Sequence, residues 1–469
     1  MRTHQSGDTP TPTGVQQPAE ERRVREQITA SNIRFINLEF TDVVGLAKCV
    51  TIPAEQFRDC LAHGKWFDGS AIEGFARVVE SDMYLRPELS TFAEIPWRPS
   101  DPRDEARGAV ARVICDVLTP SGERFEGNPR AVLVRALDEA ARLGYRYAVS
   151  PELEFFLLSQ RDGIPGEPLP HDRGGYFDLS TDLAADVRAE IVAALARMAV
   201  KIETSHHEVA GGQHELDFAA TDALLAADAV ITARQAVKAV AQRHGLWATF
   251  MPKPFYARNG SGMHIHQQLL RVSDGANAFS DPADAVYGLS TLARHFIAGQ
   301  LAHAAGLSAV LCPLVNSYKR LVPHFEAPTL INWGRVNREA LIRVPRAAAG
   351  APGGARVELR CADPSCNPYL AFAAMLHAGL DGMRRELPVP PPVEESVYPR
   401  DEAPRLLRPE GALPATLGEA LAALDGDEVV RGALGELIAE WFIEAKSQEW
   451  AEYRRQVHAW EIERYLPMF

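Results

Sequence analysis

The chain has few cysteines, no long apolar run and no excess of positive charge, and each absence excludes a class of protein. Its six cysteines among 469 residues are scattered without a Cys-x-x-Cys pair, which predicts reduced thiols and a cytoplasmic setting. No stretch approaches the roughly 18 uninterrupted apolar residues of a membrane span. The net charge of −13 argues against sequence-independent binding to nucleic acid or an anionic membrane. We therefore expect neither nucleic acid nor a membrane as a partner.

The patterns that are present predict an α+β protein with two folded parts. Residues 1–21 are polar and proline-dotted, so we expect a disordered tail. Residues 22–118 alternate apolar runs with turns, and two strand-like runs joined through Gly45 begin this small domain. From 126 to 469, strand candidates alternate with Ala/Leu-rich helical segments. This part is expected to be one large domain with helices and a largely antiparallel sheet.

The block Arg356-Val357-Glu358-Leu359-Arg360 has the tightest grouping of charges. Because side chains alternate along a strand, its arginines and its glutamate share one face. Arginine matches phosphate oxygens and glutamate offers a hard oxygen ligand, so this face suits phosphate and a metal ion together. An exposed salt-bridge ladder is the alternative interpretation.

Two further blocks bring carboxylates together. Glu152 and Glu154 leave the same face of the apolar strand candidate PELEFFLL, and exposed edge glutamates are the alternative. The segment HHEVAGGQHE surrounds a Gly-Gly turn, which is able to bring Glu208 and Glu215 to one point. Both blocks therefore predict acidic side chains that converge.

Histidines and arginines complete the candidate site. His264 and His266 share a strand face, although a lone histidine is more often hydrogen-bonded in a core than bound to a metal. The candidate metal ligands are Glu152, Glu154, Glu208, Glu215, His264 and Glu358. Such oxygen-rich ligands favour magnesium or manganese over zinc. Positive charge for phosphate and carboxylate groups comes from Arg320, Arg338, Arg343, Arg356 and Arg360. The joint pattern predicts metal-assisted phosphoryl transfer.

Seven ordered segments of the chain carry a family resemblance. They read FDGSAIEGF, SPELEFF, HHEVAGGQHELDF, FMPKPFYARNGSGMHIHQ, NSYKRLVPHFEAP, NREALIRVP and RVELRCADPSCNPYLAFAAMLHAGLDG. In these segments the chain resembles bacterial type I glutamine synthetase, from about Arg23 to Phe469. The resemblance implies an N-terminal β-grasp domain, a glutamine synthetase-type catalytic domain, and a homo-oligomer. That oligomer is expected to be a dodecamer of two hexameric rings with active sites shared between neighbouring subunits.

The resemblance also implies a role for each candidate residue. It assigns one cation to Glu154, Glu208 and Glu215, and another to Glu152, His264 and Glu358. Two or three Mg²⁺ or Mn²⁺ ions per site and ATP as co-substrate are expected. L-glutamate is expected to bind at Asn259, Gly260, Arg320 and Arg360. The nucleotide is expected at His266, Arg356 and Arg343, and the transferred phosphate at Arg338 and Arg343.

The remaining implied roles concern the nitrogen donor and regulation. Asp68 is expected to reach the neighbouring subunit's site and to remove a proton from ammonium, while Tyr176 and Glu208 complete the ammonium pocket. Glu326 is expected on a flap that closes over the intermediate. Arg77 resembles an arginine linked to glutamine inhibition in the feedback-inhibited subgroup.

The implied reaction is an ATP-dependent ligation. The γ-carboxyl of L-glutamate becomes γ-glutamyl phosphate, and ammonia then displaces phosphate to give glutamine, ADP and phosphate. Ala71, His324 and Phe325 stand where the family usually has Ser, Gly and Tyr. These departures keep open a γ-glutamyl amide ligase that uses a polyamine, ethanolamine or another primary amine. A non-catalytic scaffold and an ATP-independent metal hydrolase are further alternatives, yet no metal carboxylate is missing and a hydrolase leaves the arginines unused.

Overall fold

The computed structural model describes residues 17–69, 82–98, 108–159, 170–346, 354–395 and 411–469. They form two compact units, which we describe separately. Unit 1 lies within residues 17–40, 48–68 and 82–123, and unit 2 within residues 41–47 and 124–469. Helix α1 begins at Gln17, so residues 17–21, predicted to belong to a disordered tail, are helical.

Unit 1 contains a mixed sheet. Its described strands follow the order β2-β1-β6-β4-β3, with β5 paired to β6. The neighbouring β1 and β2 confirm the predicted strand pair, and Gly45 between them has φ +88°, which glycine adopts without steric cost. The strands are β1 (Ile33–Thr41), β2 (Ala47–Pro53), β3 (Lys65–Asp68), β4 (Asp82–Pro87), β5 (Ala93–Glu94) and β6 (Ala109–Leu118). The helices are α1 (Gln17–Ala30), η1 (Ala54–Gln56), α2 (Phe57–His63) and η2 (Leu89–Thr91).

Unit 2 contains a larger sheet whose described strands follow the order β13-β14-β15-β12-β7-β9-β8. Strands β10 and β11 pair with β7, and only the β13–β14 pairing among the described ones is parallel. The predicted antiparallel sheet is therefore confirmed. The strands are β7 (Tyr145–Ser159), β8 (Ile202–His207), β9 (Gln213–Phe218), β10 (Thr221–Asp222), β11 (Leu246–Thr249), β12 (Met263–Arg271), β13 (Leu330–Gly334), β14 (Ala340–Arg343) and β15 (Val357–Leu359).

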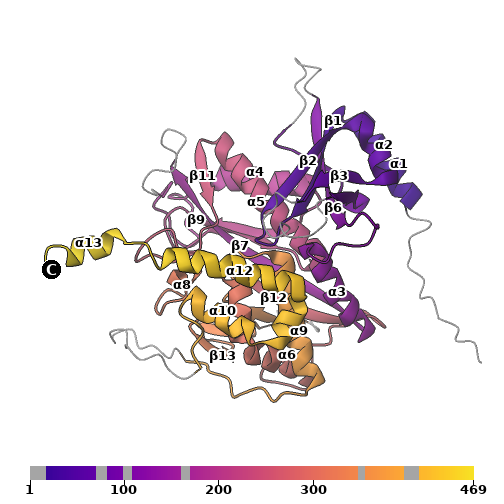
Figure 1. Ribbon diagram of the computed structural model, residues 1–469. Helices are drawn as coiled ribbons and strands as arrows, with labels where there is room; N and C mark the ends of the chain where they lie inside the picture. The colour runs from indigo at the N-terminus through magenta and orange to yellow at the C-terminus, as the bar shows by residue number, and fades with distance from the viewer. Residues whose placement is uncertain (1–16, 70–81, 99–107, 160–169, 347–353, 396–410) are drawn as a thin grey trace, which may run out of the picture. The chain divides into compact units, whose positions relative to one another are not determined.

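Helices pack around this sheet. Helix α9 is almost wholly buried, and it starts where the Asn367 side chain accepts a hydrogen bond from the Tyr369 amide, with Pro368 in the first turn. Helix α13 extends from α12 away from the rest of unit 2 (Figure 1). Among the described residues, we find no helix with the length and apolarity to cross a bilayer. The helices are α3 (Pro129–Arg142), α4 (Ala185–Arg197), α5 (Ala223–Arg243), α6 (Thr291–Ala302), α7 (Ala304–Leu311), α8 (Ser317–Arg320), α9 (Pro368–Arg384), α10 (Leu417–Asp425), α11 (Glu428–Leu434), α12 (Glu436–Tyr453) and α13 (Ala459–Tyr465).

A buried histidine joins several of these helices. His303, between α6 and α7, has Nε2 3.1 Å from the Asp381 carboxylate of α9 and Nδ1 2.9 Å from the Asp427 carboxylate that caps α11. Burial by itself lowers the pKa of His303, but the hydrogen bonds to Asp427 and Asp381 outweigh it and raise the pKa above 6.5. The imidazolium is therefore the form that stabilises this junction.

The His303 junction predicts a pH-dependent stability. A group whose pKa is raised on folding contributes stability fully below its unfolded pKa, near 6.5, and loses it as pH rises through the higher folded value. We expect the melting temperature of the wild-type protein to exceed that of His303→Gln most at pH 6, with the gap closing toward pH 9. Differential scanning calorimetry of both proteins across this range measures the gap. A gap that widens with pH would contradict the assignment.

Candidate active site

A cavity of about 600 Å³ opens in unit 2. Strands β7, β8, β9 and β12 contribute side chains to it, together with the loops before β12 and β13. Most of the predicted site residues line it: Glu152, Glu154, Tyr176, Glu208, Glu215, Asn259, Gly260, His264, Arg320, Glu326, Arg338, Arg343 and Arg360. Residues more than 200 positions apart in the sequence thus meet at one site.

Strand register explains this convergence. Glu152 of β7 lies opposite His264 of β12, and Glu154 lies opposite Glu215 of β9. Residues directly opposite in antiparallel strands have their Cβ atoms about 5 Å apart, so each pair meets on one face of the sheet. Glu358 of β15 continues the row, since it pairs with His266 on one side and Arg343 on the other. The period-2 spacing seen in the sequence therefore becomes a band of charged groups across the sheet.

The first predicted ligand group, Glu154, Glu208 and Glu215, brings three carboxyl groups to the cavity wall. Burial and the nearby Glu208 carboxylate raise the pKa of Glu154 to about 8. Burial and Glu154 likewise hold the pKa of Glu215 well above its usual range. Carboxylates that resist ionisation because they lie together are suited to a hard divalent cation, which would offset their repulsion. These donors fit Mg²⁺ or Mn²⁺.

The second predicted group contains Glu152, His264 and Glu358. His264 Nδ1 lies 3.1 Å from a Glu152 oxygen and 3.8 Å from a Glu358 oxygen. Burial and the Arg360 charge lower the pKa of His264 to about 4, so the ring is neutral, as a metal ligand must be. Glu152 ionises readily, because the His264 and His266 hydrogen bonds outweigh its burial and lower its pKa. This group also fits a divalent cation.

Glu358 is the most enclosed carboxylate of the site. Its side chain has 0 % exposure, one oxygen accepts a hydrogen bond from Arg343 Nε at 2.6 Å, and the other contacts Arg360. Burial opposes its ionisation, but Arg360, His266 and His264 lower its pKa. An exposed salt-bridge ladder on this strand is therefore excluded.

Arg320 organises the backbone of the cavity. Its guanidinium is buried and donates to the carbonyls of Arg360 at 3.1 Å and Cys361 at 2.8 Å. It also packs against Gly262, where a Cβ atom would collide with the guanidinium, so only glycine fits there. Arg320 therefore positions the cavity wall as well as contributing positive charge.

The predicted nucleotide residues His266 and Arg356 lie beside the second ligand group. His266 Nε2 is 2.6 Å from Glu152, and Arg356 Nε donates to His266 Nδ1 at 3.3 Å. Neither residue lines the cavity, and their contacts connect them to it through Glu152. Arg343, the third residue predicted to contact the nucleotide, does line the cavity.

Of the remaining predicted residues that the structure describes, Glu326 lies at the cavity. Glu326 has φ +56°, and His324 beside it has φ +72°, a region that non-glycine residues adopt at a steric cost. The loop that carries His324 and Glu326 therefore contains two strained backbone positions. Asp68 is an exposed residue of β3 in unit 1, and Arg77 lies outside the described residues.

The structure adds site residues that the sequence patterns did not single out. Gln213 Nε2 donates to Glu154 at 2.7 Å and to the Gly260 carbonyl at 3.1 Å. Asp217 also lines the cavity, and burial raises its pKa. Gln213, Glu215 and Asp217 occupy alternate positions of β9, so extending the period-2 pattern on both sides of Glu215 would have found them.

Known proteins are similar to this chain in both sequence and fold. A family model for the glutamine synthetase beta-Grasp domain matches residues 32–120, and one for the glutamine synthetase catalytic domain matches residues 126–465. The glutamine synthetase of Thermus thermophilus is 49 % identical over 449 residues, which cover 95 % of this chain and 98 % of that protein. The glutamine synthetase of Halobacterium salinarum is 49 % identical over 450 residues, with 96 % and 97 % covered.

Solved structures agree with these relatives. The "GmaS/ADP complex-Conformation 1" structure has a TM-score of 0.83 and 33 % identity, and covers 94 % of this chain and 99 % of that one. "Apo GmaS without ligand" has a TM-score of 0.81 at 34 % identity, with 94 % and 98 % covered. The fold and site thus define a ligase with a β-grasp domain and a catalytic domain, as predicted. The chain belongs to the glutamine synthetase family.

Proposed function

We propose that this chain uses the cavity of unit 2 to join the γ-carboxyl of L-glutamate to ammonia at the expense of ATP. Its relatives named glutamine synthetase, at 46–49 % identity over nearly their whole length, support ammonia as the nitrogen donor. The single observation that carries the mechanism is the band of charged groups across strands β7, β12, β15 and β14. In this band Glu152 lies opposite His264, Glu358 lies opposite His266 and Arg343, and His264 Nδ1 is 3.8 Å from a Glu358 oxygen. This band pairs acidic cation ligands with guanidinium groups that suit a transferred phosphate.

The proposed cation sites follow the two ligand groups. One Mg²⁺ or Mn²⁺ would be held by Glu154, Glu208 and Glu215. A second would be held by Glu152, His264 and Glu358. We propose two or three ions per site in total. Bound cations would supply positive charge against the phosphate oxygens of ATP. The similarity to a solved GmaS/ADP complex supports a nucleotide in this fold, and we propose His266, Arg356 and Arg343 as its contacts here.

The reaction proceeds in two steps, phosphorylation of glutamate and displacement of phosphate by ammonia. A γ-carboxylate oxygen of glutamate attacks the γ-phosphorus of ATP, and the bond to the ADP oxygen breaks. Arg338 and Arg343 offset the charge on the transferring phosphoryl group, while Asn259, Gly260, Arg320 and Arg360 hold the amino acid. Ammonia then attacks the acyl carbon of γ-glutamyl phosphate, the bond from that carbon to the phosphate oxygen breaks, and phosphate leaves with the proton that the new amide nitrogen loses.

Four residues bind the ammonium ion, accept its proton and exclude water. The ammonium ion binds beside Tyr176 and Glu208, and Asp68 of a neighbouring subunit accepts its proton, which makes the nitrogen a nucleophile. Glu326 closes the flap over the acyl phosphate and keeps water out. Burial and the charges of Glu208 and Glu215 raise the pKa of Tyr176, which supports a negative pocket suited to a cation.

A γ-glutamyl amide ligase is the second candidate. One observation favours it: the Tyr176 and Phe177 rings stack at 3.9 Å on the cavity wall, with His206 edge-on to both. Such an aromatic wall suits the alkyl chain of a primary amine. The same wall is compatible with ammonium, and turnover with each nitrogen donor distinguishes the two functions.

The assay measures phosphate release with ATP, Mg²⁺ and glutamate, and mass spectrometry identifies the product. We expect turnover with ammonium chloride, glutamine as the product, and at least tenfold lower kcat/KM with putrescine, spermidine or ethanolamine. Activity with an amine and none with ammonium would assign the second function. Phosphate release without glutamate, or none with any amine, would contradict both.

We further propose a cytoplasmic homo-oligomer, a dodecamer of two hexameric rings. Its catalytic domain spans 126–469, and the predicted first domain of 22–118 extends back to Gln17 because α1 begins there. The six free thiols support the compartment. The C-terminal segment supports assembly, because Trp460, Leu466, Met468 and Phe469 are exposed apolar residues at 60, 76, 61 and 99 %. We propose Arg77 as a determinant of glutamine inhibition, which Arg77→Ala would abolish. Native mass spectrometry of the full chain tests the subunit number.

A further inference from the structure

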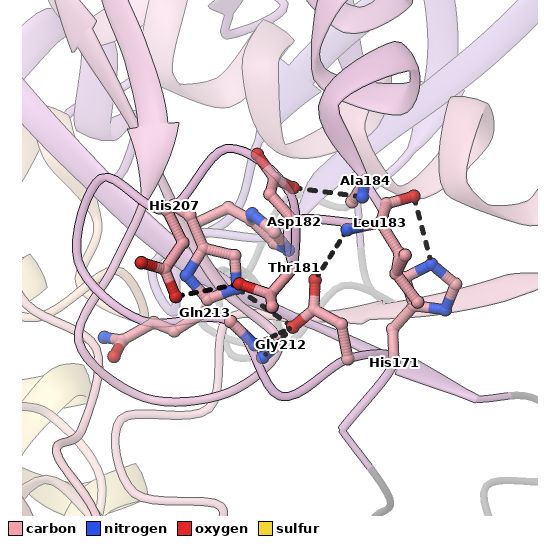
Figure 2. Close-up of polar contacts among 12 residues, drawn as sticks. His171, Thr181, Asp182, Leu183, Ala184, His207, Gly212 and Gln213 are labelled. Carbon is pink, nitrogen blue, oxygen red and sulfur yellow. Dashed lines mark hydrogen bonds and ion pairs between the residues drawn. The ribbon is translucent and has the colours of Figure 1, made fainter.

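A buried cluster of Asp172, His207 and His214 lies next to the cavity without lining it. The Asp172 and His207 side chains both have 0 % exposure, and the Asp172 carboxylate is 2.9 Å from His207 Nε2. Figure 2 shows His207, Gly212 and Leu183, which all donate to this carboxylate, close together. None of the roles proposed above uses this pair.

Asp172 binds three segments of the chain at once. Its Oδ1 accepts hydrogen bonds from the Gly212 amide at 2.8 Å, from His207 Nε2 at 2.9 Å and from the Gly174 amide at 3.3 Å. Its Oδ2 accepts one from the Leu183 amide at 3.1 Å. A carboxylate with this many donors is ionised, and its hydrogen bonds outweigh its burial and lower its pKa.

Each of these segments carries a group of the cavity. The loop between Gly174 and Leu183 carries Tyr176, and the Phe177 amide donates to the His207 carbonyl at 3.2 Å. Glu208 follows His207 directly in the chain. The turn at Gly212 leads into Gln213, which donates to Glu154. One carboxylate thus fixes the backbone on both sides of the proposed nitrogen pocket.

The cluster is not suited to a metal ion, because its donor atoms are already engaged. His207 Nδ1 faces the Glu208 carbonyl at 2.6 Å and its Nε2 faces Asp172, so both ring nitrogens donate hydrogen bonds. Arg188 donates to His214 Nδ1 at 3.0 Å and adds positive charge beside it. A ring with both nitrogens protonated has no lone pair for a cation.

We infer that Asp172 and His207 are positioning residues that hold Tyr176 and Glu208 in the relative arrangement needed to bind the nitrogen donor. The inference deepens the proposed function and rests on it. Packing supports the arrangement, since a Cβ atom on Gly174 would lie 2.7 Å from His207 Nε2 and displace the ring. The pair acts through the backbone and touches no substrate.

The test compares variants on the full-length enzyme in its Mg²⁺ form. Asp172→Asn keeps the size of the side chain but removes its charge and one acceptor, and Gly174→Ala disturbs the same contact by crowding the His207 ring. Asp228→Asn is the matched control, because Asp228 is equally buried and pairs with Arg130 at 3.1 Å outside the cavity. Ammonium chloride, ATP and glutamate are varied in turn, and thermal unfolding is recorded for each protein.

We expect Asp172→Asn and Gly174→Ala to raise the KM for ammonium about tenfold to a hundredfold, because misplacement of binding groups by about 1 Å has effects of this size. The KM for ATP should rise by a smaller factor than the KM for ammonium. Asp228→Asn should lower the melting temperature and leave both KM values unchanged. Equal ammonium KM values in all three variants and the wild type would overturn the inference, as would equal rises in the KM for ATP. Absence of wild-type turnover would instead overturn the proposed function.

Discussion

Replacing Glu358 by alanine is expected to lower the free energy of unfolding by about 3–5 kcal/mol and to remove detectable ligation. The carboxylate is completely buried and compensates the charges of Arg343 and Arg360, so alanine would leave two guanidiniums without a counter-charge. A loss of this size is a large part of the stability of a typical domain, about 5–15 kcal/mol. The same change removes a proposed cation ligand, so activity should fall even at temperatures where the variant is folded.

Urea denaturation and the phosphate-release assay measure the two effects of Glu358→Ala. Glu190→Ala is the control, because Glu190 forms a partly exposed ion pair with Arg243 at 2.6 Å, and such pairs contribute about 0–1 kcal/mol. It should retain full activity. A Glu358→Ala protein as stable as Glu190→Ala would show that the buried charges are compensated in another way.

Replacing Glu215 by glutamine is expected to remove most of the stabilisation that Mn²⁺ gives to the protein. At a cation concentration of about 100 Kd, a ligand specific for the folded state stabilises it by about 2.7 kcal/mol. If the variant binds about a hundredfold more weakly, the same concentration gives about 0.4 kcal/mol. In EDTA, Glu215→Gln should be at least as stable as the wild type. A neutral amide removes the charge that burial and the Glu154 carboxylate disfavour at this position.

Thermal unfolding in Mn²⁺ and in EDTA measures this difference for the wild type, Glu215→Gln and a control. Glu203→Gln is that control, since Glu203 is an exposed residue of β8 and does not line the cavity. The Mn²⁺ shift should be the same in Glu203→Gln as in the wild type. A full Mn²⁺ shift in Glu215→Gln would remove this residue from the cation site.

The sequence predicted the parts of the site that depend on strand periodicity. Glu152 and Glu154 share one face of β7, and Glu358 shares a face with Arg360, because side chains alternate along any strand. The two units and the antiparallel sheet also followed from local patterns of apolar and turn residues. What periodicity alone does not give is register, which decides that Glu152 meets His264 and that Glu154 meets Glu215. Register depends on packing between distant segments.

Residues whose contacts depend on loop structure were not predicted from the sequence. Asp172 lies in a stretch without a repeating pattern, and its four donors come from three separate segments. His266 is expected at the nucleotide, and the structure adds its contacts with Glu152 and Arg356, which no sequence pattern indicated. The start of α1 at Gln17 was missed because residues 17–21 are polar, and polar helices lack the apolar period that marks a helix.

Strand β7 has a consequence for how this enzyme can evolve. Glu152 and Glu154 belong to different proposed cation sites, yet they are separated by one residue of a single strand held between β12 and β9. Two residues of a strand span about 6.6 Å, so the backbone of β7 fixes the distance between the two cation sites. Changes in the surrounding loops are free to alter affinity or amine preference while the spacing stays constant. A single residue inserted between Glu152 and Glu154 would turn one of the two carboxylates to the opposite face and so remove it from its site.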